Sequence, residues 1–137
     1  MKKREAVGGI LLSEGKILLV YKVAASDGTP ITPFWGFPVG GTDGQEHYAA
    51  LIREIREETG IEITPPFQKA AEMTYQYEHK GQQIEQHVTL YLTHIQGTPT
   101  ITPEDEEITE GRWLTPQDAY ELITHDIGKN VIKELFL

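Results

Sequence analysis

The stretch REIREETGI, residues 53–61, decides the fold because it predicts an amphipathic helix with one acidic side. Glu54, Glu57 and Glu58 stand at relative positions 0, 3 and 4, a spacing that stacks side chains on one helical face. Like charges one turn apart cost a helix about 0.2–0.5 kcal/mol per pair, and nothing about folding requires that cost. The apolar positions gather on a separate flank and are Tyr48, Leu51, Ile52 and Ile55.

A hard cation such as Mg²⁺ prefers carboxylate oxygens and would offset the repulsion, so the acidic face is a candidate site for Mg²⁺, with Mn²⁺ as a substitute. The alternative interpretation is a solvated helix face, on which Arg53 and Arg56 form weak ion pairs. Gly60 suits a helix C-cap, and the glycines of FWGFPVGG, residues 34–41, can bring backbone close to a ligand. These neighbours favour a site over a solvated face.

The segment resembles the signature of the Nudix hydrolase family, G-x5-E-x7-R-E-U-x-E-E-x-G-U, in which U is a bulky apolar residue. The first half is one residue short. Counted from Gly40, the first glutamate is Glu46, whereas counted back from Arg53 its place is taken by Gln45. The missing residue bears on this accessory glutamate and its ion pair with Arg53, and not on the cation ligands. The second half matches at every defined position, with Arg53, Glu54, Ile55, Glu57, Glu58, Gly60 and Ile61.

This resemblance spans nearly the whole chain and implies a single Nudix hydrolase domain over residues 1–137. It implies an α/β fold, the Nudix-type α/β/α sandwich with a mixed sheet. The implied activity is metal-dependent cleavage of the pyrophosphate bond of a nucleoside diphosphate linked to another moiety, with dinucleoside polyphosphates and nucleoside triphosphates as candidates. Two alternatives stay open: a catalytically weak nucleotide-binding regulatory module on the same fold, and a purely structural acidic helix in an interaction domain.

The resemblance also assigns roles to the box residues. Hydrolysis of a phosphoanhydride needs charge neutralisation and a nucleophilic water, and bound Mg²⁺ supplies both. Glu57 and Glu58 are the first candidates for cation ligands, and Glu54 either ligates or accepts a proton from the attacking water. The carbonyl of Gly40 would complete the site. Arg53 would orient Glu54 by paired hydrogen bonds, although a plain surface ion pair is its alternative role.

A further carboxylate is expected from PEDEEITEGRW, residues 103–113. Glu107 is favoured as a metal-linked base because it lies six residues before Trp113, where related enzymes carry one. Glu106 is the next choice, and a solvated loop is the alternative for the whole run. The other acidic residues in the run are Glu104, Asp105 and Glu110.

Aromatic side chains are the candidates for stacking on a nucleobase. Tyr75 and Tyr77 alternate onto one strand face, and Trp35 precedes the box, although sheet packing would also explain all three. The segments WGFP and YQYEHKGQQIEQHVTLYL are loosely similar to the diadenosine-tetraphosphate branch of the family, whose Lys-Gly-His is replaced here by VGG. That similarity makes Lys80, His79 or His87 candidate phosphate contacts. The five histidines show no ligand spacing, so none is assigned a metal.

Composition is typical of one globular enzyme domain, with 137 residues, 39% hydrophobic and 24% charged. The net charge of −9 disfavours polymeric nucleic acid as a partner. It also means that a phosphorylated small molecule, such as a nucleotide, would need bound cations to approach the acidic cluster. No apolar run is long enough for a membrane span, no signal peptide is expected, and the absence of cysteine makes the cytoplasm the default location. Oligomeric state stays open.

Hydrophobic patterning predicts the order of elements along the chain. Strands are expected at residues 5–12 and 16–22, a loop at 24–33, and the box helix at 45–59. A hairpin follows at residues 68–79 and 83–95, then a loop at 98–103 and a short strand at 108–114. Helices are expected at residues 117–123, begun by Thr115-Pro116, and at 127–136.

Overall fold

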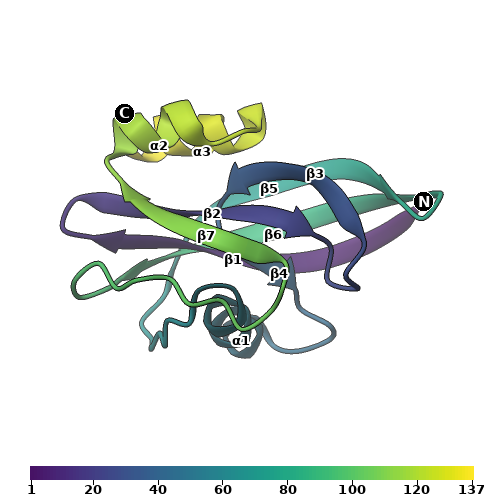
Figure 1. Ribbon diagram of the computed structural model, residues 1–137, viewed down its shortest axis with the longest axis horizontal. Coiled ribbons are helices and arrows are strands. Elements are labelled where there is room, and N and C mark those ends of the chain that lie inside the picture. Colours follow the sequence, from purple (N-terminus) through teal and green to yellow (C-terminus); the bar gives the residue numbers. More distant parts are fainter.

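A computed structural model describes all residues from 1 to 137 as one mixed sheet with helices on both faces (Figure 1). The strands are β1 (Lys2–Ser13), β2 (Lys16–Ala24), β3 (Pro30–Gly36), β4 (Val39–Gly41), β5 (Gln68–His79), β6 (Gln82–His94) and β7 (Ile108–Leu114). The helices are α1 (His47–Thr59), α2 (Pro116–Leu122) and α3 (Asp126–Phe136).

The sheet is organised around β1, which has different partners along its length. Its strand order is β3-β2-β1-β6-β5, and β1 pairs with β6 in parallel over eleven residue pairs. Its remaining partners run antiparallel to it: β2 pairs with its last two residues, and β4 pairs with residues 6–8 near its middle. β7 pairs with β2, so the acidic segment that precedes β7 lies beside the middle of the sheet. The predicted mixed sheet is therefore confirmed.

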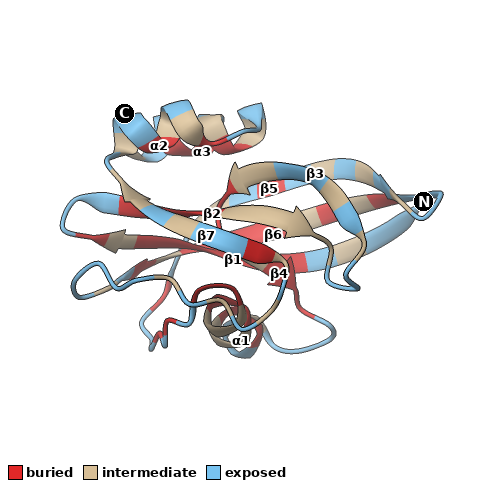
Figure 2. Cartoon of the chain, in the orientation of Figure 1, coloured by how far each residue is buried: buried red, intermediate tan, exposed pale blue.

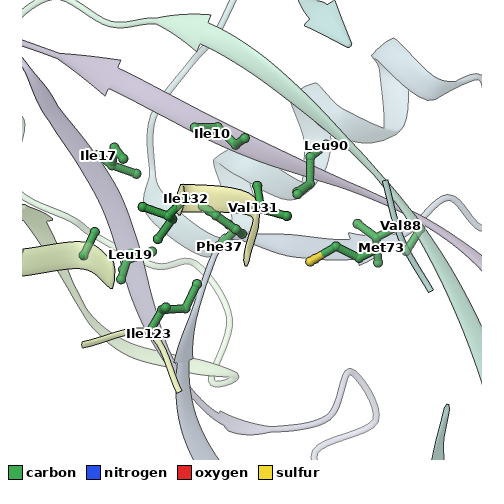
Figure 3. Close-up of a cluster of buried hydrophobic side chains, with 12 residues drawn as sticks. Ile10, Ile17, Leu19, Phe37, Met73, Val88, Leu90, Ile123, Val131 and Ile132 are labelled. Carbon is green, nitrogen blue, oxygen red and sulfur yellow. The ribbon is translucent and has the colours of Figure 1, made fainter. Parts of the chain in front are cut away.

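Both faces of the central strands are buried, which explains their nearly continuous apolar sequence. In β2, Ile17 and Leu19 face the core beneath α2 and α3, whereas Leu18 and Val20 face α1. Figure 3 shows the first of these cores, where Ile132 of α3 and Phe37 gather with residues of β1 and β2. Colouring by burial shows the same layering, with buried residues in the strands between the helices (Figure 2). The predicted α/β/α layers are confirmed.

The box helix α1 is capped at both ends by its own sequence. The Glu46 carboxylate accepts hydrogen bonds from the backbone N–H groups of Tyr48 and Ala49, at 3.0 and 3.1 Å. The helix therefore begins at His47, two residues after the predicted start. At the other end Gly60 adopts a left-handed conformation with φ of 75°, which confirms the predicted C-cap.

The predicted loop at residues 24–33 is wrong in its second half. Residues from Pro30 onward form β3, which pairs with β2 through Tyr21 opposite Trp35. The small and turn-forming residues of this segment are typical of a loop, which is why the strand was not predicted. Its prolines are tolerated because β3 lies at the edge of the sheet. The glycine lead-in to the box also pairs, as the short strand β4.

The other predicted elements are present with small shifts of their ends. β1 and β2 extend beyond the predicted 5–12 and 16–22, and the hairpin of β5 and β6 is confirmed with eleven residue pairs. The Thr115 hydroxyl caps α2 by accepting a hydrogen bond from the N–H of Asp118 at 3.2 Å, as expected. None of the three helices has the length and apolar character needed to cross a membrane.

We expect Gly60→Ala to destabilise the fold at the end of α1. A left-handed conformation costs a non-glycine residue about 1–2 kcal/mol. The added Cβ would also lie 2.7 Å from the carbonyl oxygen of Thr102. Gly97→Ala is the matched control, because Gly97 has a φ of 72° and open space around the added Cβ. Denaturant unfolding should show a larger loss for Gly60→Ala, and equal losses would contradict the packing argument.

Candidate active site

The most deeply buried acid of the molecule is Glu58, on the face of α1 that packs against the sheet. Its residue is 1% exposed, and its Oε1 accepts a hydrogen bond from the backbone N–H of Val39 in β4 at 3.3 Å. Its Oε2 is buried and has no hydrogen-bond partner. Burial raises the pKa of Glu58 well above its usual range, and the charge of Lys22 opposes this rise.

Glu54 lies one turn earlier on the same face and contacts the backbone of Gly40. The residue is 8% exposed, and a Cβ added at Gly40 would overlap the Glu54 carboxylate. Only glycine therefore leaves room for this carboxylate beside β4. Burial raises the pKa of Glu54 to about 7, although the charge of Arg53 lowers it.

Arg53 connects helix α1 to strand β4 and to the loop that precedes the helix. Its Nη1 donates to Glu54 Oε1 at 2.7 Å, and its Nη2 donates to the carbonyl oxygen of Gly41 at 3.0 Å. Its Nε donates to Gln45 Oε1 at 2.7 Å. Gln45 thus contacts Arg53 from the position where the family signature has glutamate. An ion pair with Asp43, 3.7 Å from Nη2, supplies the negative charge that Gln45 lacks.

The acidic segment before β7 contributes Glu107 to this region. Glu107 Oε2 lies 3.5 Å from Lys22 Nζ, and both side chains are largely buried. Burial raises the pKa of Glu107, and Lys22 opposes the rise. Burial lowers the pKa of Lys22, but the charges of Glu58 and Glu107 outweigh that effect and raise it. The nearby acids have other surroundings: Glu104 pairs with Arg56, Glu110 with Arg112, and Glu106 is exposed.

These residues fit a divalent cation in two respects. Glu58 Oε2 is a buried acceptor without a donor, which a cation would satisfy. Gly40 keeps its backbone open to the Glu54 carboxylate, so a backbone carbonyl and side-chain oxygens can approach each other. Glu57 is more exposed, and its Oε2 lies 3.4 Å from Arg53 Nη1. No three acidic or histidine side chains form a closed ligand set in the structure.

A cavity of about 450 Å³ lies beside the acidic cluster, between β3, β5 and the start of α3. Trp35, Tyr75 and Tyr77, the three predicted stacking residues, all line it. Lys22 and Val39 line it as well, and both also contact the acidic cluster. The carboxylates themselves do not line the cavity, but Lys22 and Val39 place them directly beside it.

The predicted phosphate contacts lie elsewhere. His79 Nε2 and Lys80 Nζ both contact Asp27 Oδ2 at 2.9 Å, which ties the hairpin turn to the loop before β3. His87 lies between Glu72 and Glu5. None of these three basic residues lines the cavity.

Sequence reasoning missed three residues of the site, Lys22, Gln45 and Gln86. Lys22 ends an apolar strand, where a lysine usually marks the exposed edge. Gln45 looked like a mismatch to the signature, although its amide can replace one carboxylate oxygen as an acceptor. Gln86 is 5% exposed and lines the cavity. Its alternation with Ile84 and Val88 on the buried face of β6 was the available signal.

Comparisons with known proteins bear on the family of this chain. The family model described as NUDIX domain matches residues 2–136. The CTP pyrophosphohydrolase of Escherichia coli is 33% identical over 129 residues, which cover 93% of this chain and 88% of that protein. The solution structure of the Escherichia coli ORF135 protein is 29% identical, with a TM-score of 0.65 and coverage of 97% and 88%.

The fold is also shared with more distant proteins. The NUDIX domain of Shewanella oneidensis NrtR, solved in complex with ADP ribose, has a TM-score of 0.74 at 14% identity, covering 98% of this chain and 86% of that one. That likeness concerns the fold alone. The family match over nearly the whole chain, together with the pyrophosphohydrolase relative, leads to one conclusion: this chain belongs to the Nudix family and is a Nudix pyrophosphohydrolase.

Proposed function

We propose that residues 1–137 form one Nudix hydrolase domain that cleaves the pyrophosphate bond of a nucleoside triphosphate and depends on a divalent cation, Mg²⁺ or in its place Mn²⁺. One observation carries the proposal: the buried carboxylates of α1 and the aromatic cavity meet at Lys22 and Val39. A substrate can therefore place its base in the cavity and its phosphates at the acids. A regulatory module that only binds a nucleotide, without hydrolysing it, would not need Glu54 and Glu58 to be buried at this junction.

The proposed cation ligands are carboxylates of α1 together with backbone of β4. The unpaired Oε2 of Glu58 and the more exposed carboxylate of Glu57 would hold the cation, with the Gly40 carbonyl beside them. When bound, a divalent cation neutralises charge on the phosphoryl oxygens and lowers the pKa of water. Arg53 holds Oε1 of Glu54, which leaves Glu54 Oε2 to ligate or to accept the proton of the attacking water.

Lys22 and Glu107 complete the proposed site from the sheet side. Lys22 is the only lysine or arginine that lines the cavity, and its Nζ lies beside Glu107. In a chain with a net charge of −9, this ammonium group is positioned to contact a substrate phosphate where base and acids meet. Glu107, held by Lys22, is the proposed further ligand or base.

The choice of a nucleoside triphosphate rests on the relative named CTP pyrophosphohydrolase and on the lining of the cavity. Aromatic rings at Trp35, Tyr75 and Tyr77 give a nucleobase faces to stack on. A dinucleoside polyphosphate has less support, because His79 and Lys80 are engaged by Asp27 and do not reach the cavity.

We expect Glu57→Gln to reduce turnover of nucleoside triphosphates on the order of 10²-fold with Mg²⁺ present, because it removes an anionic ligand of the cation that would neutralise the phosphoryl transition state. Phosphate and pyrophosphate release measures the effect. Unfolding should stay unchanged, since Glu57 is partly exposed. Glu62→Gln makes the same substitution on an exposed residue outside the site and should behave like the wild type. Undiminished turnover in Glu57→Gln would refute the assigned role.

We expect Gly40→Ala to lower turnover through Glu54, because the added methyl group would overlap the carboxylate. The double variant with Glu54→Gln should then be little slower than Glu54→Gln alone, since both changes act on one interaction. Steady-state kinetics of the two single variants and the double variant complete the cycle. If the double variant instead loses turnover by the product of the two single-variant factors, Gly40 does not act by making room for Glu54.

A further inference from the structure

A chain of hydrogen bonds forms the polar wall of the cavity. Arg4 Nη1 in β1 donates to Gln86 Oε1 at 2.9 Å, and Gln86 Nε2 donates to the Tyr75 hydroxyl oxygen at 2.7 Å. The Tyr77 hydroxyl lies 3.3 Å from Arg4 Nη1 and 3.4 Å from Gln86 Oε1. Gln86 and both tyrosines line the cavity.

The direction of these hydrogen bonds is forced by Arg4. A guanidinium group only donates, so the Gln86 atom that faces it must be the carbonyl oxygen. The amide nitrogen of Gln86 must then face Tyr75 and donate to it. The guanidinium cannot easily turn away, because it packs over Gly41, where an added Cβ would lie 2.6 Å from Arg4 Nη2. Burial of Gln86, which is 5% exposed, keeps water from replacing these partners.

The consequence falls on Tyr75. Its oxygen accepts from Gln86, so its own O–H must donate to a different group, and no protein acceptor receives it. Tyr75 therefore presents a donor to whatever occupies the cavity. Without Arg4 the Gln86 amide could rotate by 180°, and the hydroxyl would then donate to the amide oxygen instead.

We propose that Arg4 and Gln86 are positioning residues that make Tyr75 a specificity-determining donor, which selects nucleotides whose base carries a carbonyl oxygen. Cytosine, uracil and guanine have such an oxygen, which projects from the edge of the ring, whereas adenine accepts hydrogen bonds only through nitrogens that lie within its rings. The inference rests on the proposed function, because it concerns the base of the same substrate. The donor contributes to binding equally in the ground state and in the transition state, so its effect belongs in KM rather than in kcat.

The test uses Tyr75→Phe, Gln86→Glu and the double variant, with CTP, UTP, GTP and ATP as substrates. Glutamate at position 86 keeps an acceptor for Arg4 but also accepts from Tyr75, which removes the donor from the cavity while Tyr75 remains. Tyr75→Phe should raise KM for the preferred carbonyl-bearing nucleotide about tenfold, the value of one hydrogen bond, and change ATP little. Gln86→Glu should do the same, and the double variant should lose no more than either single variant.

The proposal is overturned if ATP loses as much as the carbonyl-bearing nucleotides in Tyr75→Phe, or if the two losses multiply. Thermal unfolding of each variant shows whether a loss comes from damage to the fold, and Tyr77→Phe provides a control on the neighbouring hydroxyl, for which no change in base preference is expected. If the wild type hydrolyses none of the four nucleotides, the proposed function fails. Calorimetric affinities of the same nucleotides for the wild type and Tyr75→Phe would then still decide whether the hydroxyl reads the base.

Discussion

The structure depends on the burial of two carboxyl groups, Glu54 and Glu58, between α1 and the strand β4. Removing an ionised carboxylate from water costs on the order of several kcal/mol unless partners replace the water. Glu54 has Arg53 as a partner. Glu58 accepts one hydrogen bond, from a backbone N–H group, and its second oxygen has no hydrogen-bond donor. A domain selected for stability alone would fill this space with an apolar side chain. The unpaired oxygen is therefore the clearest mark of a ligand in the molecule.

The sheet joins this acidic centre to a place for a base. Edge strands β3 and β5 lie at opposite ends of the strand order, yet both line the same cavity, because the sheet curls (Figure 1). α3 closes the cavity at one end, and the ion pairs of Asp27 with His79 and Lys80 connect the loop before β3 to the hairpin turn. Lys22 stands where the cavity and the acids meet. The site therefore has an aromatic cavity on one side of Lys22 and acids on the other, which fits a ligand with an aromatic base and phosphate groups.

Local patterns predicted the parts of the fold whose residues carry their own signals. The spacing of Glu54, Glu57 and Glu58, with Gly60 after them, gave the box helix, and alternating hydrophobicity gave the hairpin of β5 and β6. β3 was missed because its sequence has the prolines of a loop, and its pairing with β2 comes from the sheet rather than from its own residues.

The candidate site divides in the same way between local and long-range information. The acids of α1 could be named from sequence because one helix carries them. The roles of Lys22 and Gln86 could not, since Lys22 meets Glu107 only through the pairing of β2 with β7, and Gln86 meets Arg4 only through the parallel pairing of β1 with β6. A polar residue in a strand gives no sign of which distant partner will satisfy it.

Diffraction from crystals soaked in Mn²⁺, recorded at a wavelength where manganese scatters anomalously, tests the central claim most directly. The account predicts an anomalous peak between α1 and β4, within about 2.0–2.6 Å of Glu58 Oε2. Peaks confined to the protein surface, with Glu58 still buried and unpaired, would contradict it.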